Sequence, residues 1–155
     1  MVSDTAEEAC RGRPWRAGLG VFDVECEPGK AFGHGPIELA LVLLVDAARR
    51  GVGLHSSSEF LVMRDDPTRW GRNIGHHVAG VASNNPVAAG CYVMTVEADT
   101  SPSPDDAERW FAMADICDRA GIVLIDWCVR GFATAGARFA GQGAVWCPKH
   151  VAGLG

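Results

Sequence analysis

Three residues carry side chains that could perform acid–base chemistry or bind a metal ion. Glu38 stands at the start of an apolar run, where an ionised carboxylate needs either a partner or contact with water. Ser103 and Asp106 have the spacing S-x-x-D, and both can also cap the N-terminus of a helix by accepting hydrogen bonds from free backbone amides. For Ser103 and Asp106, capping alone and a role in chemistry are therefore both open.

Apolar runs predict the strands that must position these residues. Residues 37–45 form a short run rich in Leu and Val, and a turn separates it from a more polar run that starts at Val52, which indicates a hairpin. Residues 60–63 are a further strand candidate. The runs over 91–96 and 122–129 are typical of buried strands.

Two helices are predicted between these strands. The first begins near Pro67 and continues to Ala82 over apolar residues at helical spacing, although three glycines lower its intrinsic stability. These glycines are Gly71, Gly75 and Gly80. The second helix begins after Ser103 and ends at Gly121. The order strand, strand, helix, strand, helix, strand predicts an α/β sandwich.

Length and charge bound the number of domains and the classes of partner. A chain of 155 residues with 48% hydrophobic and 21% charged residues fits one folded domain. We expect this domain over residues 37–131, with an N-terminal extension over 1–36 that packs on it and a Gly-rich C-terminal segment over 132–155. The formal net charge of -5 argues against nucleic acid as a partner.

Membrane insertion and secretion are not expected either. The longest uninterrupted apolar stretch, Leu39 to Val45, is much shorter than the roughly 20 residues that cross a bilayer. The first ten residues lack the basic and apolar regions of a secretory signal. The six cysteines are scattered without a C-x-x-C pair, which is typical of reduced core thiols. We therefore expect a cytoplasmic protein.

Short motifs follow one another in a fixed order along residues 37–131. The run over 37–46 has a glutamate near its start and closes on an aspartate before the predicted hairpin turn. The segment S-P-S-P-D-D at 101–106 precedes a helix and then G-I-V-L-I-D-W at 121–127. Together these motifs resemble the JAB/MPN (JAMM) metalloprotease domain, in particular its RadC-like branch. The resemblance implies a cytidine-deaminase-like α/β sandwich with a mixed central sheet flanked by helices.

The family pattern implies a role for each residue that matches it. The pattern is a glutamate on the first strand, then H-x-H, then seven residues, then S-x-x-D. The histidines and the aspartate hold zinc, the serine helps to position the metal-bound water, and the glutamate moves the proton. Glu38, Ser103 and Asp106 match the glutamate, the serine and the aspartate. The histidine positions fall on Val93 and Thr95, and neither side chain can replace an imidazole ligand.

We therefore expect neither a metal ion nor another cofactor in this protein. A catalytic zinc ion usually has three protein ligands, and Asp106 alone will not hold it. Adjacent residues on a helix point about 100° apart, so His76 and His77 cannot both face one metal ion. His34 could reach the same end of the sheet, which leaves a rebuilt metal site as an alternative.

The first functional hypothesis is an enzyme on this frame without zinc. If the family's cleft gathers carboxylates, their mutual repulsion raises one pKa towards neutrality and creates an acid and base pair. Such a pair could act on a small organic substrate by cyclisation, isomerisation, elimination or hydrolysis. Glu38, Asp106 and Ser103 would be its catalytic residues. The residues expected to line the substrate site are Thr95, Glu97, Val93 and Trp127.

The second hypothesis is a binding or scaffold module, as in metal-free MPN domains that serve assembly. Its partner would be another protein, and a homodimer is a further alternative. This hypothesis predicts a shallow, filled cleft and a sizeable apolar surface patch around the Gly-rich tail over residues 131–155. The enzyme hypothesis predicts a deep pocket around Glu38, Thr95 and Asp106.

Overall fold

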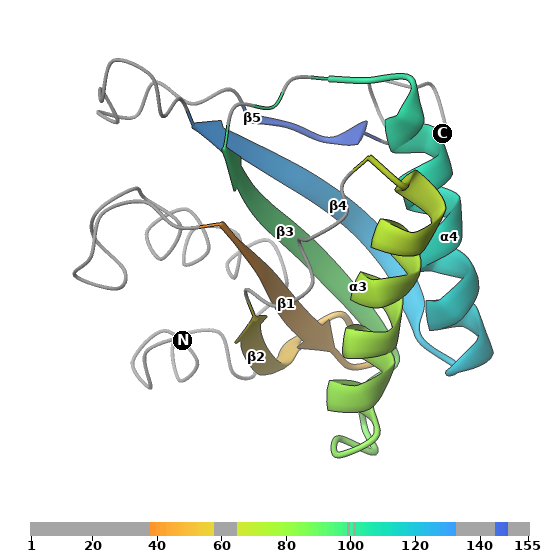
Figure 1. Ribbon diagram of the computed structural model, residues 1–155. Helices are drawn as coiled ribbons and strands as arrows, with labels where there is room; N and C mark the ends of the chain where they lie inside the picture. The colour runs from red at the N-terminus through yellow and green to blue at the C-terminus, as the bar shows by residue number, and fades with distance from the viewer. Residues whose placement is uncertain (1–37, 58–64, 99, 101, 133–144, 149–155) are drawn as a thin grey trace.

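A mixed five-stranded sheet forms the centre of the computed structural model, which describes residues 38–57, 65–98, 100, 102–132 and 145–148 (Figure 1). The strands are β1 (Leu39–Val45), β2 (Gly51–Ser57), β3 (Gly90–Ala98), β4 (Val123–Phe132) and β5 (Val145–Trp146). Their order in the sheet is β2-β1-β3-β4-β5. Strand β1 is antiparallel to both neighbours, β3 and β4 are parallel, and β5 is antiparallel to β4. The predicted α/β class is therefore confirmed.

Two helices, α3 (Pro67–Ala82) and α4 (Asp105–Arg119), lie side by side on one face of the sheet (Figure 1). Helix α4 lies between β3 and β4 in the chain, and two neighbouring parallel strands need a crossover connection of this kind. The apolar faces of both helices pack against alternate residues of β1, β3 and β4. The sequence predicts helices that flank the sheet, and the helices in the described residues share one face.

The predicted strands and helices are largely where the sequence puts them. The four predicted strands over 37–45, from Val52, over 91–96 and over 122–129 are present, with shifts of a few residues at their ends. Strand β5 was not predicted, because two residues carry no periodic signal. The candidate strand over 60–63, the extension over 1–36 and most of the segment over 132–155 lie outside the described residues. No helix among the described residues has the length and apolar composition to span a membrane.

Both ends of α4 carry the predicted capping features. The backbone N–H of Asp105 donates to Oγ of Ser103 at 3.2 Å, and the N–H of Ser103 donates to Oδ2 of Asp106 at 3.1 Å. These reciprocal bonds resemble a capping box, but the Ser103 hydroxyl accepts from Asp105 and not from Asp106, and the N-cap residue of the observed helix is Pro104. At the other end, Gly121 has a φ angle of 75°, which a glycine adopts without strain. Helix capping alone therefore accounts for much of the Ser103 and Asp106 signal.

Glycines on α3 allow the two helices to approach each other closely. A Cβ atom added to Gly71 would collide with the backbone oxygen of Arg109, and one added to Gly75 would lie 2.7 Å from Cβ of Ile116. By contrast, a Cβ atom on Gly80 would meet nothing within 4 Å. Gly71 and Gly75 therefore do more than lower helix propensity, because a larger residue at either position would push α3 away from α4.

Replacing Gly71 or Gly75 by alanine should destabilise the protein, and Gly80→Ala is the matched control. We expect Gly71→Ala to lower the free energy of unfolding by about 1–3 kcal/mol, because the backbone of α4 must move. Gly80→Ala should raise it by up to about 1 kcal/mol through helix propensity. Urea unfolding of the three variants measures these differences, and equal effects at all three positions would contradict the close approach.

Candidate functional site

Strand β3 carries two polar side chains into the interior beneath the helices. Cys91 and Val93 belong to the core between the sheet and the helices, and Thr95 and Glu97 follow on the same face because side chains alternate along a strand. Thr95 is 0% exposed and Glu97 is 2% exposed. The Thr95 hydroxyl donates a hydrogen bond to Oε2 of Glu97 at 2.8 Å.

Trp127 on β4 completes a chain of three hydrogen-bonded side chains. Its indole Nε1–H donates to Oγ1 of Thr95 at 2.9 Å, so the hydroxyl accepts one hydrogen bond and donates another. Buried polar groups need such partners, because an unsatisfied group costs about 1–3 kcal/mol. The hydrogen bonds among Trp127, Thr95 and Glu97 therefore compensate for the burial of these polar groups away from solvent.

A β-bulge in β4 turns Trp127 towards the helices. Cys91 pairs with Leu124 and Tyr92 pairs with Asp126, so Ile125 is an extra residue in the ladder. Without it, Leu124 and Trp127 would point to opposite faces of the sheet, whereas both belong to the helix-side core. The backbone N–H of Trp127 donates to Oδ1 of Asp126 at 2.8 Å, next to the bulge.

A buried ion pair lies on the first turns of α4. Nη1 of Arg109 is 2.9 Å from Oδ1 of Asp106, and the two residues are 4% and 2% exposed. The second carboxylate oxygen of Asp106 accepts the hydrogen bond from the Ser103 backbone. Both carboxylate oxygens of Asp106, which the sequence predicts as a catalytic residue, therefore accept hydrogen bonds from neighbouring residues of its own segment.

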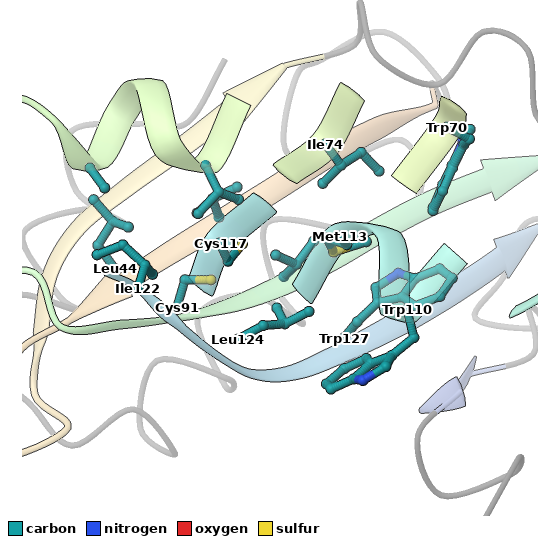
Figure 2. Close-up of a cluster of buried hydrophobic side chains, with 14 of the residues drawn as sticks. Leu44, Trp70, Ile74, Cys91, Trp110, Met113, Cys117, Ile122, Leu124 and Trp127 are labelled. Carbon is teal, nitrogen blue, oxygen red and sulfur yellow. The ribbon is translucent and has the colours of Figure 1, made fainter. Parts of the chain in front are cut away.

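Tryptophan rings connect the ion pair to the hydrogen-bonded chain. The guanidinium carbon of Arg109 lies 5.7 Å from the ring centre of Trp70, within the range of a cation–π contact. The ring of Trp70 is 5.2 Å from that of Trp127, at an angle of 46°. Figure 2 shows Trp70, Trp110 and Trp127 at the same end of the hydrophobic cluster. Aromatic rings therefore occupy the space between the polar groups of the sheet and those of α4.

Glu38 has a structural partner at the end of the sheet. Its Oε1 accepts a hydrogen bond from the backbone N–H of Ala98 at 2.9 Å, and the residue is exposed. The carboxylate thus continues the pairing between β1 and β3 by one step. The backbone N–H of Ala98 is thus the partner that the Glu38 carboxylate needs at the start of an apolar strand.

The structure brings some of the expected site residues together. Thr95, Glu97 and Trp127 are joined by hydrogen bonds, and Glu38 binds the residue that follows Glu97. Val93 is fully buried, with Val42 and Trp127 as its partners on the neighbouring strands. Ser103 and Asp106 are joined to each other through helix capping.

Sequence analysis missed two residues that contact this group, Arg109 and Trp70. The spacing of Asp106 and Arg109 is that of neighbours on a helix surface, so the ion pair could have been found from the sequence. The tilted ring contact between Trp70 and Trp127 has no local signal, because it depends on how α3 crosses the sheet.

The described residues contain no group of three or more His, Cys, Asp and Glu side chains that could hold a metal ion. His76 is exposed and the adjacent His77 is half-buried, both on α3. His34, the other alternative for a rebuilt site, lies outside the described residues. Among the described residues, Asp106 alone matches a ligand position of the JAB/MPN pattern.

A shallow depression among the described residues lies at the opposite end of the sheet from Glu38. It is lined by the β1–β2 turn and the starts of β3 and β4, including Asp46, Arg49 and Val123. The Asp46 carboxylate accepts hydrogen bonds from the backbone N–H groups of Ala48 and Arg50. This carboxylate therefore supports the turn.

Comparisons with models of protein families, with curated proteins and with solved structures found no match for this chain. The likeness to the JAB/MPN domain is thus carried by the motifs alone.

A double-mutant cycle can measure the contact between Thr95 and Trp127. Thr95→Val keeps the side-chain volume and removes the hydroxyl, and Trp127→Phe removes the indole N–H. We expect a coupling free energy of about 1 kcal/mol from urea unfolding of the two single variants and the double variant.

Thr95→Ser is the matched control, because it keeps the hydroxyl and loses a methyl group. Its coupling to Trp127→Phe should match that of threonine itself. Strictly additive effects of Thr95→Val and Trp127→Phe would show that the hydrogen bond contributes nothing.

Proposed function

We propose that this chain is a metal-free, JAB-like binding or scaffold module. The observation that carries the proposal is the closed set of hydrogen bonds among Trp127, Thr95 and Glu97, in which Thr95 is a position that the motif resemblance aligns with a zinc-binding histidine. Thr95 and Glu97 are almost inaccessible to solvent, so they offer little surface to a substrate. A module that binds a protein partner needs a folded frame and no open catalytic cleft.

Several features support the JAB-like frame itself. The chain order of a hairpin, a helix, a strand, a second helix and a further strand agrees with the fold that the motifs imply. Val93 and Thr95 share one face of β3, as two ligands of one metal ion would. The α4 helix that carries Asp106 covers that same face.

Acid/base catalysis on a small organic substrate is the second candidate. It is favoured by two buried carboxylates, Glu97 on β3 and Asp106 on the first turn of α4. In the described structure these carboxylates are bound to Thr95 and to Arg109, so catalysis would require a rearrangement that breaks one of these contacts. A binding or scaffold module requires no such rearrangement, and we therefore prefer it to the enzyme.

The indole N–H signal of Trp127 in an NMR spectrum can distinguish these candidates. We expect this signal to keep its position when the full chain is titrated with Zn²⁺ or with mixtures of small organic acids and amines. The reason is that the indole N–H is bound to Thr95 inside the protein. Trp127→Phe identifies the signal.

Two outcomes of this titration would contradict the module. A saturable shift with organic compounds that disappears in Glu38→Gln would favour the enzyme, since glutamine keeps an oxygen for the Ala98 N–H. A shift with Zn²⁺ that disappears in Asp106→Asn would reveal a metal site. Circular dichroism of both variants checks that they remain folded.

A further inference from the structure

The four cysteines of the described residues form two pairs, one on each face of the sheet. Cys91 on β3 and Cys117 on α4 are both 0% exposed and lie in the core beneath the helices. Cys128 on β4 lies on the opposite face, and Cys147, directly after β5, packs against the same cluster. All four are reduced thiols in this structure.

The register between β4 and β5 places Cys128 opposite Cys147. Arg130 pairs with Val145 and Val129 pairs with Trp146, so the next pair along these antiparallel strands is Cys128 and Cys147. Directly opposed residues in such strands have Cα atoms about 4.5–5.5 Å apart. Disulfides span Cα separations of about 4.4–6.8 Å, so these two cysteines can be joined with little movement of the backbone.

We propose that Cys128 and Cys147 form a reversible disulfide that fastens β5 to the edge of the sheet, with hydrogen peroxide as the oxidant. This disulfide goes beyond the proposed module function, and the proposal does not depend on that function. Short edge strands are held by few backbone hydrogen bonds, and a covalent link at this position would hold β5 in register.

Formation of the disulfide consumes two thiols and one molecule of hydrogen peroxide. The Cys147 sulfur attacks a peroxide oxygen, the O–O bond breaks, and the thiol becomes a sulfenic acid with release of one water molecule. The Cys128 sulfur then attacks the Cys147 sulfur, the S–O bond breaks and a second water molecule leaves. Two electrons pass from the thiols to the peroxide, and each thiol loses one proton.

Exposure makes Cys147 the first of these cysteines to react. It is half-buried, whereas Cys91, Cys117 and Cys128 are buried. A hydrogen bond with Cys128, followed by burial and the nearby charge of Asp126, holds the pKa of the Cys147 thiol well above its ordinary value. The thiolate is the reactive form, so oxidation should be slow at pH 7 and accelerate about tenfold with each pH unit.

The other titratable groups that face Cys128 and Cys147 do not lower the pKa of the Cys147 thiol. Tyr92 on β3 and Asp126 on β4 surround the two thiols among the described residues. Burial raises the pKa of Tyr92, so its phenol stays neutral through the same pH range. Neither group supplies the positive charge that would stabilise a thiolate.

Peptide mapping of the oxidised full chain tests the proposal. Purified protein is treated with hydrogen peroxide at pH 8, the remaining thiols are alkylated in denaturant, and the digest is analysed by mass spectrometry. We expect a peptide that joins Cys128 to Cys147 within one chain, the loss of these two cysteines from the alkylatable thiols, and their recovery with dithiothreitol.

Variants supply the controls. Cys147→Ser should abolish this loss, while Cys91→Ser should retain the joined peptide because it changes only the enclosed pair. If a Cys128→Ser variant does not fold, the peptide map of the wild-type protein is sufficient to test the proposal. The proposal is overturned if both cysteines remain alkylatable after treatment, or if either of them is joined instead to another cysteine.

Discussion

The hydroxyl of Thr95 is the group on which the described site depends. It is fully buried and must both donate and accept a hydrogen bond, and Glu97 and Trp127 satisfy it from two strands. This arrangement needs the alternation of β3, which points Thr95 and Glu97 to one face, and the bulge at Ile125, which turns Trp127 to meet them. Helices α3 and α4, which approach each other closely at Gly71, pack on this face of the sheet.

The described contacts also account for the residues on which the resemblance to the JAB/MPN pattern rests. Where the JAB/MPN pattern has imidazole nitrogens for zinc, this chain has a core valine and a hydroxyl that is already hydrogen-bonded. Asp106 neutralises Arg109 and caps its own helix. A set of residues that matches a catalytic pattern in sequence is thus accounted for, in the described structure, by interactions that stabilise the fold.

Local sequence signals predicted the helices and strands. The arrangement of the site residues depends instead on contacts between segments that are distant in the sequence. The strand and helix positions follow from hydrophobic periodicity, and the capping bonds of Ser103 and Asp106 follow from their spacing. The bulge at Ile125 could not be predicted, because an extra residue in a ladder is defined only by the partner strand. The same holds for Gly71, whose lack of a side chain looked unfavourable to the helix until α4 was placed against it.

Hydrogen exchange of the Trp127 indole N–H is the most direct measurement of the closed site. If the hydrogen bond to Thr95 is buried as described, this proton should exchange at least about a thousandfold more slowly than a solvent-exposed indole, because exchange requires the core to open. Exchange at the rate of an exposed indole would show that water reaches the hydroxyl of Thr95, and it would contradict the account given above.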